Sequence, residues 1–442
     1  MLHLLHINDT EGPAHEVWPR LVTALRSHHQ AATSTLLLHA GDIPLEDDNA
    51  PQLLPLLQSL HFDALALGNH DIGEHSMAML RLGALPFVCA NIVSPAWEKV
   101  RPYYYLDRAG WRIALIGITL PDLRRYIPAR FLQGVEIADP LLVLPALMQQ
   151  LRPIADIVIL ISHAGFGCDL ELAHKIAGID IIVGGHDHAQ LTEPIIIGQT
   201  MIVQAEAHGA SLGLLSLSRY QRQWQLLPSM DYAPDSEAMQ LLSRTTTSSS
   251  RILGYTHTHL RAVNPYVATA LNCLVVDLLR DYAQSELALL RCASIANSLA
   301  PGAITEQDLH RCVRCGADQV ARLSCTGAEL WHTLEQGARE DYYLLTISGA
   351  RIVYDLGQPV GQRVLHVEIA GQPIELERSY SIACSEVLAN GVGNFDVLAR
   401  NTHMTLSDTI YELLLRYLQA HPIIAPAADN RLSFVNYSAG AV

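Results

Sequence analysis

Five apolar runs in the first half of the chain each end in side chains that can bind a metal ion. The runs are LLHIND ending at Asp9, LLLHAGD at Asp42, LALGNHD with Asn69 and His70, IVILISHAG with His163, and IIVGGHDH with His186 and His188. Each motif alone has an ordinary structural interpretation, because Asn, Asp and Gly favour turns and a histidine can be buried in a core. Five occurrences at the same kind of position favour one shared site.

The side chains in these motifs predict a centre with two metal ions. Carboxylates, an amide oxygen and imidazoles suit Mn²⁺, Fe and Zn²⁺. Two ions about 3.5–4 Å apart share a bridging carboxylate and act on the attacking and leaving oxygens of a displacement reaction. A glycine directly precedes Asp42, Asn69 and His186, which lets the backbone approach such a cluster without a Cβ.

The apolar runs alternate with helical patterns, which predicts a layered α/β domain. Ligands of such sheets bind beyond the carboxyl ends of the strands, where these motifs lie. The predicted strands are Leu2–Ile7, Thr35–Ala40, Ala64–Leu67, Phe87–Asn91, Arg112–Ile118, Ile157–Ile161, Ile179–Val183 and Met201–Gln204, with helices at Trp18–His28 and Ala50–Leu60.

The chain of 442 residues is long enough for two domains. A polar stretch that ends in SRTTTSSSR separates the two halves, and such a composition is typical of a linker. We predict a first domain at residues 1–233, a linker at 234–255 and a second α/β domain at 256–442. Helices of the second domain are expected at Pro265–Ala283, Thr326–Glu335 and Ser407–His421.

The composition excludes some partners. A net charge of −15 argues against binding to nucleic acid polymers, which need a basic surface. No apolar stretch reaches membrane-spanning length, and the N-terminus lacks the pattern of a signal peptide. We therefore expect a cytoplasmic protein with no membrane partner. The alternative is that a longer precursor is exported. The eight cysteines are scattered, and the pair Cys312 and Cys315 is expected to be reduced rather than to bind a structural zinc.

The motifs HIND, AGD, LGNHD, ISHAG and GIDIIVGGHDH resemble those of the metallophosphoesterases, specifically the two-domain 5′-nucleotidase and UDP-sugar hydrolase family. The second half is similar more weakly, through LNCLVVDLLR, APGAITEQDL, LSCTGAEL, TISGARIVYD and YSIACSEVLANGVGNFDVL. The resemblance covers nearly the whole chain. It implies an N-terminal four-layer α/β/β/α metallophosphoesterase domain and a C-terminal α/β domain of the 5′-nucleotidase type.

The resemblance also implies roles for single residues. Asp9 and His188 would hold the first ion, Asp42 would bridge, and Asn69, His163 and His186 would hold the second. His70 would lie at the phosphate and stabilise the transition state, a role that suits an imidazole beside metal ions. Substrate contacts are expected at Asn91, Asn390, Gly391 and Phe395, although an aromatic residue without its partner, as Phe395 is here, is more often a core residue.

The chain departs from the family pattern at three places. Glu11 replaces a metal-binding histidine, and it either ligates, favouring Mn²⁺ or Fe over Zn²⁺, or points away. Gly73 replaces the aspartate that orients the catalytic histidine; Asp71 or Glu74 could substitute, and loss of this orienting residue would reduce the rate without abolishing it. In the second half, Arg291–Ala296 replaces the substrate-binding NGGGIR motif, and Arg314 with Cys315 replaces a Pro-Phe pair.

We therefore predict a phosphohydrolase with two divalent metal ions (Mn²⁺, Fe or Zn²⁺) that releases phosphate from a small phosphorylated substrate. A nucleotide is the substrate that the resemblance implies. Three alternatives stay open: a cyclic-nucleotide phosphodiesterase, a sulfur-ester hydrolase like the thiosulfohydrolases, and a degenerate metal-binding scaffold whose second domain serves a partner.

Overall fold

The computed structural model describes residues 1–11, 14–30, 34–45, 50–243, 251–262, 268–291, 294–295, 297–313, 318–339, 344–424, 426 and 431–435. The chain divides into two compact units. The first comprises residues 1–123 and 129–247, and the second comprises residues 124–128 and 248–442.

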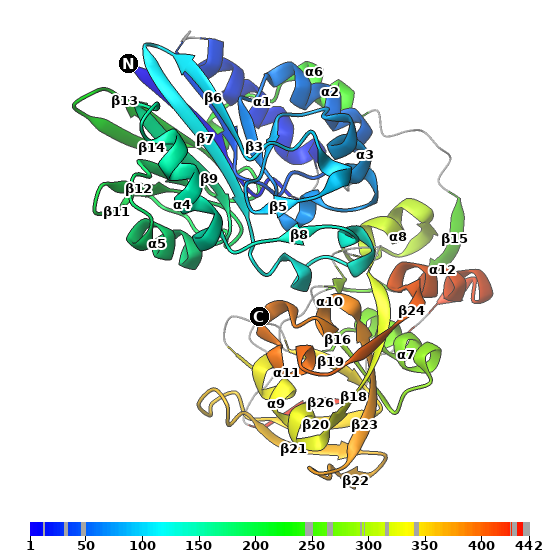
Figure 1. Ribbon diagram of the computed structural model, residues 1–442. Coiled ribbons are helices and arrows are strands. Elements are labelled where there is room, and N and C mark those ends of the chain that lie inside the picture. Colours follow the sequence, from blue (N-terminus) through cyan, green and yellow to red (C-terminus); the bar gives the residue numbers. More distant parts are fainter. Residues whose placement is uncertain are drawn as a thin grey trace. The chain divides into compact units, whose positions relative to one another are not determined.

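Two six-stranded sheets form the centre of the first unit (Figure 1). The first sheet has the order β14 (Arg222–Pro228), β13 (Ser211–Leu217), β1 (Leu2–Ile7), β2 (Thr35–His39), β3 (Ala64–Ala66) and β4 (Phe87–Val88). The second has the order β11 (Ile195–Ile197), β12 (Thr200–Val203), β10 (Ile181–Val183), β9 (Ile157–His163), β7 (Trp111–Thr119) and β6 (Tyr103–Arg108). All eight strands predicted for this half of the chain are present, with ends shifted by a few residues.

Helices cover the outer faces of the two sheets, which gives the predicted four-layer α/β/β/α arrangement. Alternate residues of β1 and β2, such as Leu4 and Leu38, share a buried core with Leu115 and Ile159 of the other sheet. The first sheet is covered by α1 (Ala14–Gln30) and α2 (Ala50–Leu60), and the second by α4 (Pro140–Leu151) and α5 (Phe166–Lys175), whose side chains pack on the opposite face of β7 and β9. The short helix α3 (Glu74–Leu82) lies between β3 and β4 in the chain.

Strand direction brings the predicted ligands to one edge of each sheet. β1, β2, β3 and β4 run parallel, and so do β7, β9, β10 and β12. The strands that the sequence pattern missed are mostly antiparallel edge strands, namely β6, β11 and β14, together with β13. The three edge strands carry exposed residues, so their hydrophobic pattern is weaker than that of the buried parallel strands, whereas β13 is mostly buried.

The second unit is a separate α/β body with its own core. Its largest sheet has the order β19 (Leu345–Ser348), β16 (Leu287–Arg291), β23 (Ser379–Ser385), β18 (Gln319–Thr326) and β24 (His403–Thr409). Smaller sheets join β22 (Gln372–Pro373), β21 (Val364–Ile369), β20 (Ala350–Tyr354) and β26 (Leu432–Phe434), and β17 (Gly302–Thr305), β15 (Ile252–Thr256) and β25 (Ile423–Ile424). Its main helices are α7 (Ala270–Ala283), α8 (Glu306–Cys312), α9 (Gly327–Gly337) and α12 (Ile410–Ala420).

Capping residues explain where these helices begin. Thr269, Thr326 and Thr409 each accept a hydrogen bond from a backbone amide of the first turn, which satisfies a donor that the helix itself leaves free. The helix expected at Ser407–His421 therefore starts three residues late, because residues up to Thr409 belong to β24. The N-terminal part of the helix expected at Pro265–Ala283 lies mostly outside the described residues.

The polar stretch after Pro234 begins with a helix, α6 (Ser236–Ser243), that packs on α1 and α2 in the first unit. Arg26 of α1 pairs with Asp235 and Glu237. Residues 244–250, which include most of SRTTTSSSR, lie outside the described residues. Among the helices described, none combines the length and the apolar character needed to cross a membrane.

Candidate metal centre

The turns that follow β1, β2 and β10 hold their ligand residues in a strained backbone conformation. Asp9, Asp42, His186 and His188 have φ values of 47°, 60°, 82° and 54°. Residues other than glycine rarely adopt this left-handed backbone conformation, and such outliers concentrate at functional sites. Four of them within one cluster indicate that function, rather than backbone preference, maintains these residues.

One half of the cluster gathers the four side chains expected at the second ion. Asn69 Oδ1 lies 3.3 Å from His163 Nε2 and 3.1 Å from His186 Nδ1. His163 Nε2 also lies 3.2 Å from Asp42 Oδ2. Four donor atoms from four different strand ends therefore converge on one point.

A backbone contact sets the tautomer of His163. Its Nδ1 lies 2.7 Å from the carbonyl oxygen of Ala40. Because a carbonyl oxygen only accepts hydrogen bonds, Nδ1 must carry a proton and donate it. In the neutral imidazole Nε2 then keeps the lone pair that a metal ion needs, an arrangement common among metal-binding histidines.

The other half of the cluster contains Glu11, which points inward. Glu11 Oε1 lies 3.3 Å from His188 Nε2, and Glu11 Oε2 lies 3.0 Å from His70 Nε2. Asp9 Oδ1 lies 4.0 Å from His188 Nε2. The carboxylate that replaces the family's histidine thus occupies a place from which it can bind an ion, and it also contacts the expected catalytic histidine.

Neighbouring groups fix the carboxylate of Asp9. Asn8 donates a hydrogen bond of 2.7 Å to Asp9 Oδ2, and the backbone amide of His186 donates one of 2.9 Å to Asp9 Oδ1. Asn8 is itself held by two hydrogen bonds to the backbone of Ala205. The turn after β1 is therefore tied to the turns after β10 and β12.

Two glycines allow the strand ends to come this close. A Cβ on Gly41 would lie 2.5 Å from His163 Nδ1. A Cβ on Gly68 would overlap Asp42 Oδ1 and lie 2.5 Å from the backbone nitrogen of Asp42. The glycines in these motifs therefore have a steric explanation, because a side chain at their positions would clash with the ligand residues.

Asp71 connects two of the ligand turns. Its carboxylate accepts hydrogen bonds from the backbone amides of Asp42 (2.9 Å), Ile43 (2.7 Å) and Gly68 (2.7 Å), and its side chain is completely buried. These contacts hold the turn of Asp42 against that of Gly68. The side chain that contacts the ring of His70 is Glu11; the side chain of Glu74 lies outside the described residues.

Protonation of the ion-free cluster follows from its charges. Burial by itself lowers the pKa of His163, but the charge and hydrogen bond of Asp42 outweigh burial and raise that pKa to about 10. Burial likewise raises the pKa of Asp42, but His163 holds it well below its usual range. Burial lowers the pKa of His186 to about 4, which keeps this ring neutral at pH 7, and the Glu11 hydrogen bond raises the pKa of His188.

The donor set fits divalent cations. Asp9, Glu11 and Asp42 are 0%, 9% and 2% exposed, and three buried carboxylates this close repel one another unless positive charge offsets them. Carboxylate oxygens of Glu11 and Asp42 lie within 4.8 Å of ring nitrogens of nearby histidines, in groups that share members. Oxygen and imidazole donors without thiolates match Mn²⁺, Fe and Zn²⁺.

The sequence motifs missed one member of the cluster, His208. A ring nitrogen of His208 lies within 4.8 Å of ligand atoms of Glu11 and His188, and its ring packs edge-on against that of His188. His208 follows β12, in the sequence AEAHGAS. Because β12 already ends at Val203, no strand-end motif in the sequence marks this histidine.

The expected substrate residues make contacts within their own units. Asn91 is 1% exposed, and its amide bonds to the backbone of Thr119 and Ala138. Phe395 is 1% exposed within the core of the second unit, so stacking on a substrate would require its segment to open. Asn390 and Gly391 end the short helix α10 (Glu386–Ala389). Of the stretches that replace NGGGIR and Pro-Phe, residues 292–293, 296 and 314–315 lie outside the described residues.

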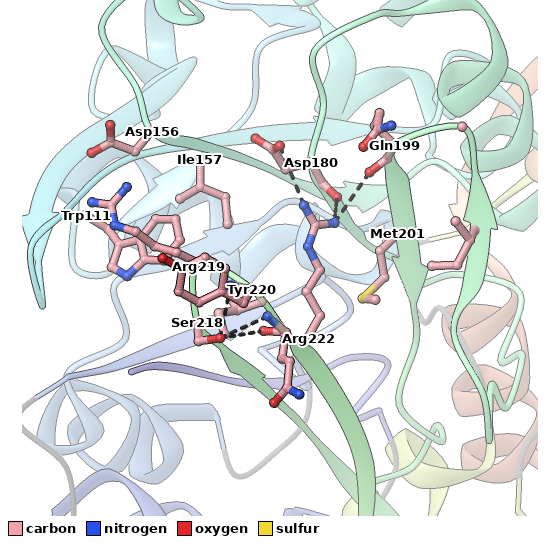
Figure 2. A pocket seen from close by; sticks show the side chains of 14 residues that line it. Trp111, Asp156, Ile157, Asp180, Gln199, Met201, Ser218, Arg219, Tyr220 and Arg222 are labelled. Carbon is pink, nitrogen blue, oxygen red and sulfur yellow. Dashed lines mark hydrogen bonds and ion pairs between the residues drawn. The ribbon is translucent and has the colours of Figure 1, made fainter.

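A cavity of about 440 Å³ lies at the opposite, amino-terminal ends of β7, β9 and β12 (Figure 2). Arg222 reaches across it to the carbonyl oxygens of Asp180 and Gln199, and Arg219 lies over the ring of Trp111. Its arginines thus face backbone oxygens, carboxylates or an aromatic ring. The residues that line the cavity include none of the candidate metal ligands described above.

Comparison with known families agrees with this geometry. The calcineurin-like phosphoesterase family matches residues 2–190, the part that carries every proposed ligand except His208. The family described as "5′-nucleotidase, C-terminal domain" matches residues 249–400. The chain belongs to the two-domain 5′-nucleotidase family of metallophosphoesterases.

Several known proteins are similar to the chain over most of its length. The "Uncharacterized metallophosphoesterase YunD" of Bacillus subtilis is 23% identical, over 88% of this chain and 93% of its own. The "Snake venom 5′-nucleotidase" of Naja atra is 23% identical over 94% and 92%. The structure of a putative 5′-nucleotidase from Staphylococcus aureus has a TM-score of 0.79 at 18% identity, over 98% of this chain and 99% of that one, which supports the fold.

Proposed function

We propose that the protein is a phosphohydrolase that uses two divalent metal ions to release phosphate from a nucleotide. The observation that carries this proposal is the convergence of Asn69, His163, His186 and Asp42 on one point, beside a second group formed by Asp9, Glu11 and His188. A carboxylate oxygen of Asp42 lies within 4.8 Å of ligand atoms of His163 and His186, and one also lies within 4.8 Å of ligand atoms of Glu11 and His70, as suits a bridging ligand.

The residues of the site would perform distinct tasks. Two divalent ions in this site supply Lewis-acid polarisation of the phosphate and a nucleophile at neutral pH. Asp42 would hold the two ions at a fixed separation, and Asp71 would keep the turn of Asp42 against that of Gly68 through its three backbone hydrogen bonds. Such preorganisation matters because phosphoryl transfer depends mainly on positioning and electrostatics.

His70 would stabilise charge on the phosphoryl group or the leaving oxygen. Its side chain is 32% exposed, and its Nε2 lies beside Glu11 at the open side of the cluster. Its backbone amide donates a hydrogen bond of 2.8 Å to Asp42 Oδ1. This contact fixes the main chain of His70 relative to Asp42, and the ring, whose Nε2 contacts Glu11, would turn to a substrate from this position.

The nucleotide is proposed from the family alone, since several relatives carry the name 5′-nucleotidase. The test is a substrate panel on Mn²⁺-loaded protein: p-nitrophenyl phosphate, its bis ester, nucleoside 5′-monophosphates and 2′,3′-cyclic nucleotides. The proposal expects phosphate release from the 5′-monophosphates, and none from metal-free protein or from Asp42→Asn. Activity on the bis ester or cyclic nucleotides alone would indicate a phosphodiesterase, and no activity on any ester would contradict the proposal.

A further inference from the structure

We propose that His208 is a ligand of the ion bound by Glu11 and His188, and that it supplies the imidazole which the family pattern places at position 11. This inference rests on the proposed function, because it assumes that the cluster holds two ions. A ring nitrogen of His208 lies within 4.8 Å of a Glu11 carboxylate oxygen and of a His188 ring nitrogen. Two ligands of one ion with bonds of about 2.1 Å lie at most about 4.2 Å apart, so only a small adjustment is required.

Two hydrogen bonds prepare His208 for this role. Its backbone amide donates a hydrogen bond of 2.7 Å to the carbonyl oxygen of Asp9. Its Nδ1 lies 3.1 Å from the carbonyl oxygen of Glu11. Because that oxygen only accepts, Nδ1 carries the proton, and in the neutral ring Nε2 keeps a lone pair for a cation. His163 is prepared in the same way by Ala40.

The backbone of His208 resembles that of the expected ligands. Its φ of 56° matches the positive φ values of Asp9, Asp42 and His188. Glycine would adopt this conformation at lower cost, so a histidine at this position implies a task for its side chain. The ring packs at 4.8 Å, edge-on, against the ring of His188, on the side of the cluster where Glu11 has replaced an imidazole.

The charges of the ligands are also consistent with binding of His208 to the ion. A glutamate at position 11 adds a negative charge to a cluster that already contains Asp9 and Asp42. A neutral imidazole from the turn after β12 adds a donor without adding further charge. The site would thereby keep the imidazole that the family pattern provides, supplied from a different turn, and would have the Glu11 carboxylate as one additional ligand.

Calorimetric titration of the metal-free protein with Mn²⁺ tests this assignment. Wild type is expected to bind two ions, and His208→Ala is expected to weaken one of the two affinities by at least about 10-fold while leaving the other unchanged. His208→Gly, which suits the left-handed backbone, should give the same loss and guards against misfolding. The control is His61→Ala, because His61 is also exposed, also has a positive φ of 55° and precedes β3 at the opposite edge of the sheet.

A double variant makes the test sharper. Glu11→His combined with His208→Ala should recover the lost affinity, since it returns an imidazole to the position where the family has one. Two wild-type affinities in both His208 variants would overturn the inference and leave the proposed function intact. If wild type itself binds fewer than two ions, the proposed function fails together with the inference.

Discussion

Replacing Gly68 by alanine tests the close approach of the strand ends without removing a ligand. The backbone of Gly68 is extended, with φ −95° and ψ 177°, so alanine adopts it without strain. The added Cβ, however, would overlap Asp42 Oδ1 and lie 2.5 Å from the nitrogen and 2.8 Å from Cγ of Asp42. The variant therefore pushes directly on the carboxylate of Asp42, the proposed bridging ligand.

The size of the effect follows from these contacts. Overpacking a tight site costs typically about 1–3 kcal/mol, and contact with a backbone nitrogen places Gly68→Ala at the upper end. A domain of this size loses about 2–4 °C of melting temperature per kcal/mol, which predicts a decrease of roughly 6–12 °C. Because Asp42 is displaced, we expect Mn²⁺ affinity to fall about 10- to 100-fold, as for other changes that misorient a ligand.

Gly167→Ala is the matched control. Gly167 lies in α5, and a Cβ there would meet no atom within 4 Å. Alanine is the better helix former, so this variant should gain up to about 1 kcal/mol and bind Mn²⁺ normally. Differential scanning calorimetry and Mn²⁺ titration measure both effects. A Gly68→Ala protein with the wild-type melting temperature and Mn²⁺ affinity would refute the steric argument.

Three further predictions concern single residues of the cluster. His70→Asn should keep both Mn²⁺ affinities but lower kcat by about 10²-fold, the usual scale for a lost transition-state donor; an unchanged kcat would remove His70 from the mechanism. Glu11→Gln should lower Mn²⁺ affinity about 10- to 100-fold, and identical isotherms would show that Glu11 is not a ligand. The pKa of about 10 for His163 exceeds its unfolded value of about 6.5, so protonated His163 stabilises the ion-free fold below pH 6.5, and this contribution declines as the pH rises toward 10. Because Mn²⁺ must displace the same proton, the apparent Mn²⁺ affinity should rise about tenfold from pH 7 to 8. A pH-independent Mn²⁺ affinity would contradict the raised pKa.

The sequence predicted the parts of the site that depend on strand ends. Buried parallel strands have strong apolar patterns, and the ligand motifs follow them directly, so the positions of Asp42, Asn69 and His163 could be anticipated. The direction of the Glu11 side chain could not, because a glutamate in a turn can face either solvent or the cluster. The structure places it between His70 and His188.

Other features depended on tertiary contacts that no local pattern reveals. His208 follows a strand that was predicted, but a single histidine in a turn carries no spacing that marks it as a ligand. Asp71 stood next to His70 in the sequence, yet its carboxylate faces the backbone of Asp42, Ile43 and Gly68. Phe395 matched a family landmark, and only the packing around it shows that its ring is buried.

The most direct test of the account is the metal content of the protein after Mn²⁺ loading and removal of free ions. Wild type should retain two Mn²⁺ ions per chain, with an electron paramagnetic resonance spectrum of coupled ions, because one carboxylate bridges them. Asp42→Asn should weaken both sites, since the bridge belongs to each. Absence of bound Mn²⁺ in wild type, or two uncoupled ions that persist in Asp42→Asn, would contradict a shared two-metal centre at these strand ends.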